Sequence, residues 1–268
     1  MLTKIHLPVL FFALVVTLAA CTNELERTLK NPDVTTRYTK AISLYDAGKY
    51  ADSKALLETV MPMMKGTPKA QEAFWYYADV HYKLREYLSA AYYYKTFAST
   101  FPNSDKAEEA QYMSANCYYR LSPTPMLDQD YTTKAIEAFQ IYVNTYPTSK
   151  HAEEGTRSID ELREKLYRKD YDAAELYFKI GYYQAAVHSL RNLLKNYPDA
   201  HDAEKARYLI VKSYYFLAQN TVEVKQAERY QETLAAYLEL VDKHPGGKYA
   251  KEASKIFDAA TTRLKELQ

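Results

Sequence analysis

The chain has 268 residues, and its 35 basic and 34 acidic side chains give a formal net charge of +1. This balance excludes a dedicated nucleic-acid-binding protein, because phosphate binding needs a basic face that releases counterions. Hydrophobic residues make up 47% of the chain and only 6 residues are glycine, so we expect a folded body that is not a turn-rich β protein.

The N-terminal segment, residues 1–20, has the pattern of a cleaved lipoprotein signal peptide. Lys4 gives it a positive start, and residues 7–20 are apolar apart from Thr17, too short a run for a comfortable membrane span. The run ends in Leu-Ala-Ala-Cys, which resembles the bacterial lipoprotein processing box. The thiol of Cys21 is then the atom that takes the lipid. An ordinary signal peptide that happens to precede a cysteine is the alternative.

After Cys21 the chain is expected to be tethered to a lipid bilayer by several acyl chains, since one chain alone anchors only marginally. Residues 21–35 are read as a short tether, broken at Asn31-Pro32-Asp33. No aspartate follows Cys21 to indicate retention in the inner membrane. We therefore predict an outer-membrane anchor on the periplasmic face. The scattered acids near Glu24 match surface-export tracts only weakly, so surface display stays an alternative.

Beyond residue 35 the sequence repeats itself. Four junctions share an aromatic or histidine residue followed by proline: Phe101-Pro102, Tyr146-Pro147, Tyr197-Pro198 and His244-Pro245. An alanine-rich helix start follows each of them, and an earlier copy follows Thr67-Pro68. Proline ends one helix and favours the first turn of the next. A chain in which such junctions recur, each between two helices, is predicted to be an all-α solenoid of helix pairs.

The best-preserved copies resemble the tetratricopeptide repeat, with small residues at helix crossings and large ones in the grooves between hairpins. The second copy has Ala78, Ala90 and Pro102 at the expected positions, and the fourth has Ala174, Gly181 and Ala186. We predict about five hairpins: copies one to three in residues 36–150, and copies four and five with a C-terminal capping helix in 151–268. The third and fifth copies are expected to carry eight to ten extra residues between their helices. A separate charged helix is expected at about 151–168.

The tyrosine excess, 28 residues in all, follows a pattern. In the first helix of every copy two aromatic residues stand seven positions apart, which places each pair on one helix face. The pairs, called the aromatic ladder below, are Tyr38/Tyr45, Trp75/Tyr82, Tyr112/Tyr119, Tyr171/Phe178 and Tyr208/Tyr215.

In tetratricopeptide proteins these helix positions line the concave groove, so the ladder of copies one to three is a candidate wall for an aromatic-rich peptide. Asp79, Lys83, Asn116 and Arg120 flank the same face and are candidates to hold the peptide backbone or its terminal carboxylate. The alternative is that the rings only pack between repeats.

Catalytic motifs are absent from the sequence. The six histidines form no helical metal-ligand pair, and no phosphate-binding glycine loop or nucleophile elbow is present. We expect no enzyme, no metal and no cofactor. Cys117 lies in an apolar helical run and is read as a small buried hydrophobic residue.

The lipoprotein box together with five hairpins resembles the BamD family, also called YfiO or ComL, of the β-barrel assembly machinery. The resemblance covers roughly residues 69–245. It includes the phrase Tyr146-Pro147-Thr148-Ser149 and the run from Tyr171 to Val187. It implies that the N-terminal repeats receive the targeting strand of unfolded outer-membrane proteins. It also implies that the C-terminal repeats dock the POTRA domains of the barrel-forming partner, BamA, through basic residues near the start of the fifth repeat. Lys205 and Arg207 stand in that region.

Two other classes remain open. One is a different periplasmic tetratricopeptide lipoprotein, such as a coordinator of cell division or peptidoglycan synthesis. The other is a sugar-capturing lipoprotein of the SusD type, which the short chain disfavours.

Overall fold

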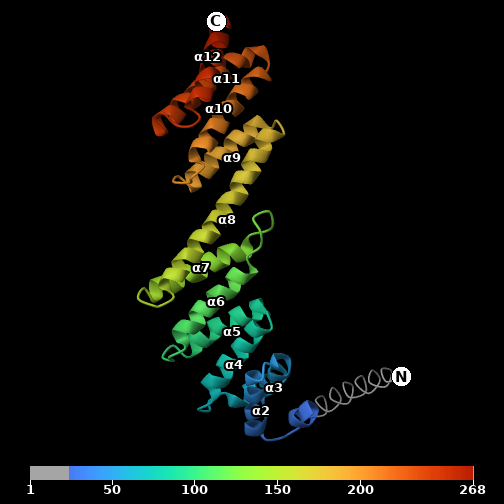
Figure 1. The fold of residues 1–268 in the computed structure, drawn as a ribbon. Coiled ribbons are helices and arrows are strands. Elements are labelled where there is room, and N and C mark those ends of the chain that lie inside the picture. Colours follow the sequence, from blue (N-terminus) through green and yellow to red (C-terminus); the bar gives the residue numbers. More distant parts are fainter. Residues whose placement is uncertain (1–23, 268) are drawn as a thin grey trace, which may run out of the picture. The chain divides into compact units, whose positions relative to one another are not determined.

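A computed structural model describes residues 24–267, which form helices joined by short connections and contain no strand (Figure 1). A helical segment at 24–29 precedes the longer helices. These are, in chain order, α2 (Val34–Asp46), α3 (Tyr50–Met64), α4 (Ala70–Lys83), α5 (Tyr87–Thr100), α6 (Ala107–Leu121), α7 (Asp130–Thr145), α8 (Ala152–Lys179), α9 (Tyr183–Asn196), α10 (Ala203–Gln219), α11 (Glu223–Lys243) and α12 (Ala250–Glu266). The predicted all-α class is confirmed.

Consecutive helices pair as hairpins, and neighbouring hairpins meet where α3 packs on α4, α5 on α6 and α9 on α10. The pairs are α2–α3, α4–α5, α6–α7, the C-terminal part of α8 with α9, and α10–α11, while α12 packs on α11 and α10. Because almost all helix contacts join elements close in sequence, this is the quasi-one-dimensional packing of an α-solenoid. The prediction of about five hairpins with a capping helix is confirmed.

Three of the hairpin turns have the same backbone conformation, with one residue at positive φ. Gly48, Arg85 and Gly181 occupy the same position, with φ of 73°, 61° and 83°. In each turn the next residue's N–H bonds a carbonyl five residues earlier, as in Lys49 N to Leu44 O at 2.8 Å and Glu86 N to His81 O at 2.9 Å. These bonds satisfy helix-end carbonyls. Glycine suits the left-handed conformation, whereas Arg85 holds it against the steric cost of a Cβ atom.

The structure differs from the sequence-based expectation at two connections. The charged helix expected at 151–168 and the first helix of the fourth copy are one helix, α8, because no glycine or proline interrupts residues 156–180. The extra residues of the fifth copy lengthen α10 and α11, and only Asn220–Val222 separate those helices. The extra residues of the third copy do form a connection, residues 122–129.

The chain divides into two compact units. Unit 1 contains residues up to Pro123 together with Gln129–Leu162, and unit 2 contains Thr124–Asp128 and Arg163 onward. Unit 1 is built around three clusters of buried side chains, one per hairpin, and unit 2 around a large cluster on α8–α12 and a small one on α10–α12. The boundary falls inside α8, later in the chain than the division expected at residue 150.

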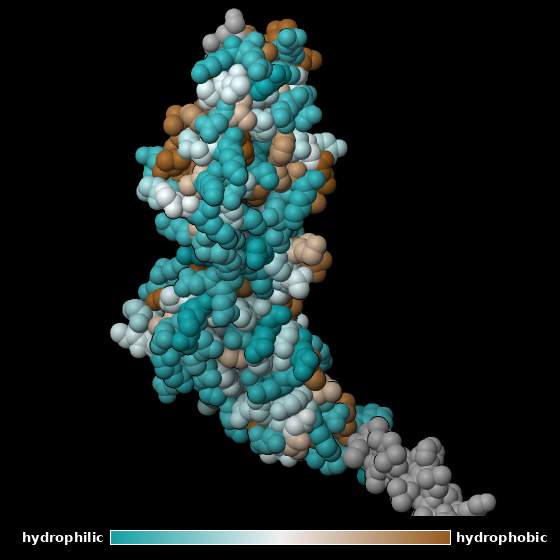
Figure 2. All heavy atoms as spheres, turned by 45° about the horizontal axis from the view of Figure 1, so that its top comes forward, coloured by the Kyte–Doolittle hydropathy of each residue, from teal (hydrophilic) through white to brown (hydrophobic). Residues whose placement is uncertain are grey.

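The expected tether is ordered from residue 24. The segment 24–29 is helical, and its Leu25 and Leu29 pack against the core of the first hairpin. The predicted signal peptide, residues 1–20, and Cys21 lie outside the described residues. No helix within residues 24–267 is long and apolar enough to cross a bilayer. On the face seen in Figure 2, hydrophilic residues predominate and hydrophobic ones form separate patches.

Candidate functional site

The first members of the aromatic ladder lie in the protein core, apart from Tyr208, which is half-buried. Tyr38, Trp75, Tyr112 and Tyr171 are between 1% and 8% exposed. Trp75 packs edge-on against Tyr94 at 5.5 Å and Phe97 at 5.6 Å between ring centroids. These rings join the helices of a hairpin to one another, so they offer a bound peptide almost no surface.

The second members are half-buried, and in unit 1 each hydroxyl reaches a polar side chain on the first helix of the next copy. Tyr45 donates to Asp79, Tyr82 donates to Asn116 Oδ1 at 3.3 Å, and Tyr119 donates to Glu161 Oε2 at 2.6 Å. The bond to Glu161 and partial burial raise the pKa of Tyr119. The ladder therefore ties successive repeats together and leaves the partly exposed faces of Tyr45, Tyr82 and Tyr119 as its accessible part.

Asp79 is a buried carboxylate, 7% exposed, at the centre of this arrangement. Besides the bond from Tyr45 it accepts one from the hydroxyl of Tyr94, which is fully buried on α5, at 2.5 Å. Burial and then the Asp79 charge raise the pKa of Tyr94 far above its ordinary value. The sequence placed Asp79 on the ladder face and Tyr94 at a bulky position of the second copy, but it did not show that the two meet, because Tyr94 comes from the second helix of the hairpin.

Of the other three residues that flank the aromatic ladder in unit 1, one forms a hydrogen bond within the chain and two are exposed. Asn116 is half-buried by its bond to Tyr82. Lys83 is exposed, with its Nζ 3.9 Å from Asp79 Oδ2, and Arg120 is exposed at the end of α6. Lys83 and Arg120 each follow a second-member tyrosine directly in sequence. Each of these two half-exposed rings is therefore next in sequence to a cation, on α4 and on α6, the first helices of successive copies.

Cys117 lies behind this face and is fully buried. Burial, followed by the nearby Asp79 charge, raises the pKa of its thiol to about 12. The prediction that Cys117 is a small buried hydrophobic residue is confirmed, since a thiol of that kind is neutral and unreactive at ordinary pH.

Both candidate docking residues lie on α10 in unit 2 and are partly engaged within the chain. Lys205 Nζ is 3.0 Å from Glu175 Oε1 and 5.2 Å from the ring centroid of Tyr171, both on α8. Those two partners, Tyr171 first, raise the pKa of Lys205. Arg207 lies against His244 Nε2 at 3.4 Å, and its buried Nε has no hydrogen-bond partner among residues 24–267.

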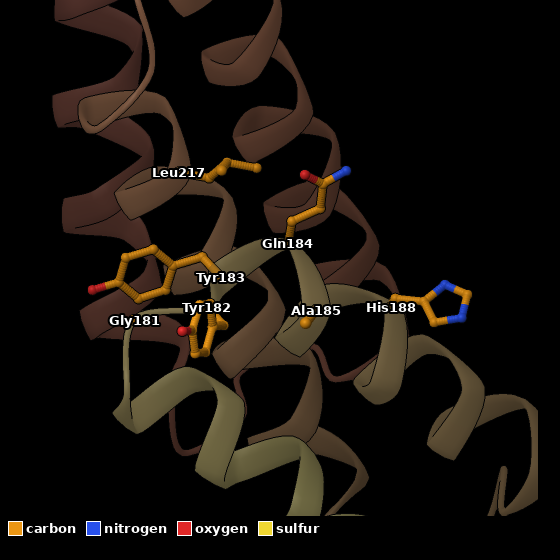
Figure 3. A pocket seen from close by; sticks show the side chains of 7 residues that line it. All are labelled: Gly181, Tyr182, Tyr183, Gln184, Ala185, His188 and Leu217. Carbon is orange, nitrogen blue, oxygen red and sulfur yellow. The ribbon is translucent and has the colours of Figure 1, made fainter.

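Unit 2 also has an open hollow of about 640 Å³ at the turn between α8 and α9. Its lining comes from three elements: Gly181, Tyr182, Tyr183, Gln184, Ala185, His188 and Leu217 (Figure 3). Around the neighbouring turns several apolar side chains are more than half exposed: Leu176, Ile180, Tyr182, Val222 and Val224. This surface could not be predicted from the sequence, because its lining combines a turn with residues of two helices, α9 and α10, that are distant along the chain.

Within the described residues no group of three or more His, Cys, Asp or Glu side chains is arranged to hold a metal ion. His151 stacks on Tyr112 at 4.2 Å between centroids and lies 3.5 Å from Glu154. That pair is accounted for by packing and a surface ion pair.

Comparison with known proteins gives one family. The profile of the YfiO family, described as an outer membrane lipoprotein, matches residues 30–229. Among curated proteins the chain is 29% identical over 205 residues to a putative outer membrane protein assembly factor BamD of Aquifex aeolicus, covering 75% of this chain and 65% of that protein. It is 24% identical over 216 residues to BamD of Rickettsia prowazekii, covering 81% and 85%.

A third relative, the outer membrane protein assembly factor BamD of Caulobacter vibrioides, is 25% identical over 140 residues and covers 52% of this chain and 46% of that protein. The chain thus spans less than two thirds of the length of the Aquifex and Caulobacter relatives. Among solved structures, the tetratricopeptide domain of P58(IPK) aligns with this chain at 14% sequence identity and a TM-score of 0.39. The alignment covers 94% of this chain and 68% of the P58(IPK) chain. A TM-score this low supports no conclusion about the fold. The α-solenoid is shown by the helix packing described above.

Proposed function

Because the chain belongs to the YfiO family of outer membrane lipoproteins, we propose that it is a non-catalytic scaffold in the assembly of outer-membrane β-barrel proteins. The family match over residues 30–229 carries this proposal. The solenoid supports it, because stacked hairpins present long surfaces to other proteins. In this proposal an acylated Cys21 holds the protein on the periplasmic face of the outer membrane, unit 1 receives unfolded clients, and unit 2 docks a BamA-like POTRA partner.

For the client site we propose the accessible part of the ladder in unit 1. Tyr45, Tyr82 and Tyr119 offer ring faces of the kind that suits aromatic and apolar side chains of an extended strand. Lys83 and Arg120 lie next to two of these rings and are suited to the terminal carboxylate of such a strand. The fixed hydroxyl bonds hold the rings in place, so little side-chain freedom is lost on binding.

The client site predicts that Tyr82→Ala combined with Tyr119→Ala weakens binding of a peptide ending in an outer-membrane targeting strand by about tenfold, since each ring supplies contact area near the centre of the site. Fluorescence anisotropy of a labelled peptide measures the affinity. Tyr92→Ala is the matched control, because Tyr92 is 61% exposed on α5, the second helix of the hairpin. Equal affinities for the two variants, both with native far-UV circular dichroism, would exclude the ladder as the client site.

For the partner site we propose Lys205 and Arg207 on α10 of unit 2, together with the apolar turns around the hollow of Figure 3. Aliphatic and tyrosine side chains exposed on neighbouring turns supply an apolar contact. Lys205 keeps about a third of its side chain exposed while it pairs with Glu175, so it can share a carboxylate of the partner.

Purification of the tagged protein from detergent-solubilised outer membranes tests the function as a whole. We expect a POTRA-containing barrel protein to co-purify, and Lys205→Ala with Arg207→Ala to lower its amount about tenfold, the scale of a lost charged contact of more than 1 kcal/mol. Lys255→Ala, an exposed lysine on α12, is the control. Consistent absence of such a protein with the unaltered chain would refute the assembly function and favour another periplasmic adaptor role.

A further inference from the structure

The segment that leads from the proposed anchor into the solenoid is bound to the first hairpin. Leu25 and Leu29 are four residues apart on one face of the 24–29 helix and pack against the cluster that contains Tyr38 and Val60. At the start of the segment, Lys40 Nζ on α2 lies 2.6 Å from Glu24 Oε1. A helix this short does not persist alone in water, so these tertiary contacts hold it.

The link from this segment to α2 is also fixed. Asn31 Oδ1 accepts a bond from Asp33 N at 2.9 Å, and Pro32 between them has a fixed φ. Asp33 then caps α2 by accepting bonds from Thr35 N and Thr36 N, at 3.2 and 2.9 Å. From Glu24 onward the chain therefore has no free residues that would let the first hairpin move away from its attachment point.

We infer that the first hairpin is held directly against the lipid surface, with the docked segment 24–29 as a strap. The inference rests on the proposed acylation of Cys21. Only three peptide units join Cys21 to Glu24, and whatever their conformation they span at most about 11 Å. Glu24 and its partner Lys40 then lie within about that distance of the lipid headgroups. A free linker through residue 33 would reach several times farther.

The short covalent connection from Cys21 to Glu24, and not electrostatic attraction, holds the first hairpin at the lipid surface. Residues 24–46 contain four acidic and four basic side chains, so the first hairpin has no basic excess to attract anionic lipid. We therefore expect the first hairpin to lie against a bilayer surface whether its headgroups are charged or neutral. For the proposed function, the ladder begins at the membrane: Tyr45 stands on the same helix as Lys40, and a client strand bound there starts beside the bilayer into which it inserts.

The test uses the full-length acylated protein in vesicles of phosphatidylethanolamine and phosphatidylglycerol that contain a lipid with a headgroup nitroxide. A fluorophore is attached to Ser43→Cys, an exposed position one helical turn from Lys40. Cys117 is fully buried and stays unlabelled in the folded protein. We expect strong quenching. Inserting about 20 Gly/Ser residues between Asn23 and Glu24 adds a coil of about 25 Å, so quenching should fall to roughly a third.

Two variants of the strap complete the test. Leu25→Ser with Leu29→Ser frees the segment and should lower quenching as the insertion does. Glu26→Ser with Arg27→Ser, on the exposed side of the same helix, should leave it unchanged. Mass spectrometry and vesicle flotation report acylation separately. An unacylated chain that does not float refutes the anchor and this inference together. An acylated, bound chain that is quenched no more than its insertion variant refutes this inference alone.

Discussion

Replacing Phe139 with alanine should lower the free energy of unfolding of unit 1 by about 3–5 kcal/mol, a large part of the total stability of a domain. Phe139 is 1% exposed on α7 and packs against Tyr112, at 6.0 Å between ring centroids, and in the same cluster as Ile159 and Leu162 of α8. Its removal leaves a cavity where the third hairpin meets α8. The close approach of Gly155 to α7 limits how far the helices can move to fill it.

Urea unfolding followed by far-UV circular dichroism measures this loss, with hydrogen exchange to locate it in α6, α7 and α8, since a solenoid need not unfold in one step. The matched control is Ile141→Ala, two residues farther along α7, where the side chain is 57% exposed. That change should cost less than about 0.5 kcal/mol. Similar losses for the two variants would mean that the α7–α8 contact is not a packed core.

Asp79→Ala should destabilise unit 1 by about 3 kcal/mol, because it leaves the buried hydroxyl of Tyr94 without an acceptor and removes the partner of Tyr45. Tyr94→Phe removes only one of the two bonds and should cost about half as much. In the double variant the two losses should not add, with a coupling energy of about 1–2 kcal/mol, since both changes remove the same bond. Thermal and urea unfolding measure all three variants.

Lys83→Ala is the control for Asp79. Its ammonium is 3.9 Å from the Asp79 carboxylate and lies in solvent, so its removal should cost less than about 1 kcal/mol. Strictly additive losses for Asp79→Ala and Tyr94→Phe would contradict the bond between them. A fall in client affinity with Lys83→Ala at unchanged stability would separate the binding role of this face from its structural role.

If the proposed client site is correct, structural and binding roles fall on different members of the aromatic ladder. The first members and the Asp79 bonds hold the hairpins together, whereas the second-member rings and the two neighbouring cations stay partly accessible. Trp75 belongs to the first group and lies under Lys106, 4.4 Å from its ring centroid. Its fluorescence is therefore expected to report the packing of the second hairpin and to respond to a client only indirectly.

The sequence by itself determined the helices and their pairing. Proline junctions, small residues at crossings and apolar periodicity act within one hairpin, and in a solenoid nearly all contacts are between neighbours in the chain. The same local reasoning was wrong where it assumed that every copy begins with a separate helix. Helix α8 continues past the helix end expected near residue 168, because residues 156–180 contain no glycine or proline that would end it. The docked segment 24–29 escaped notice because Leu25 and Leu29 alone are too short a pattern to predict a helix.

Only the tertiary structure decided which aromatic residues are buried. A spacing of seven fixes that Tyr38 and Tyr45 share a helix face, but not that Tyr38 is 3% exposed while Tyr45 is half-buried. That difference depends on the next copy, which supplies Asp79 from α4 and Tyr94 from α5 to the space beside Tyr45. Helical periodicity names a face of one helix, whereas burial is set by what packs against that face.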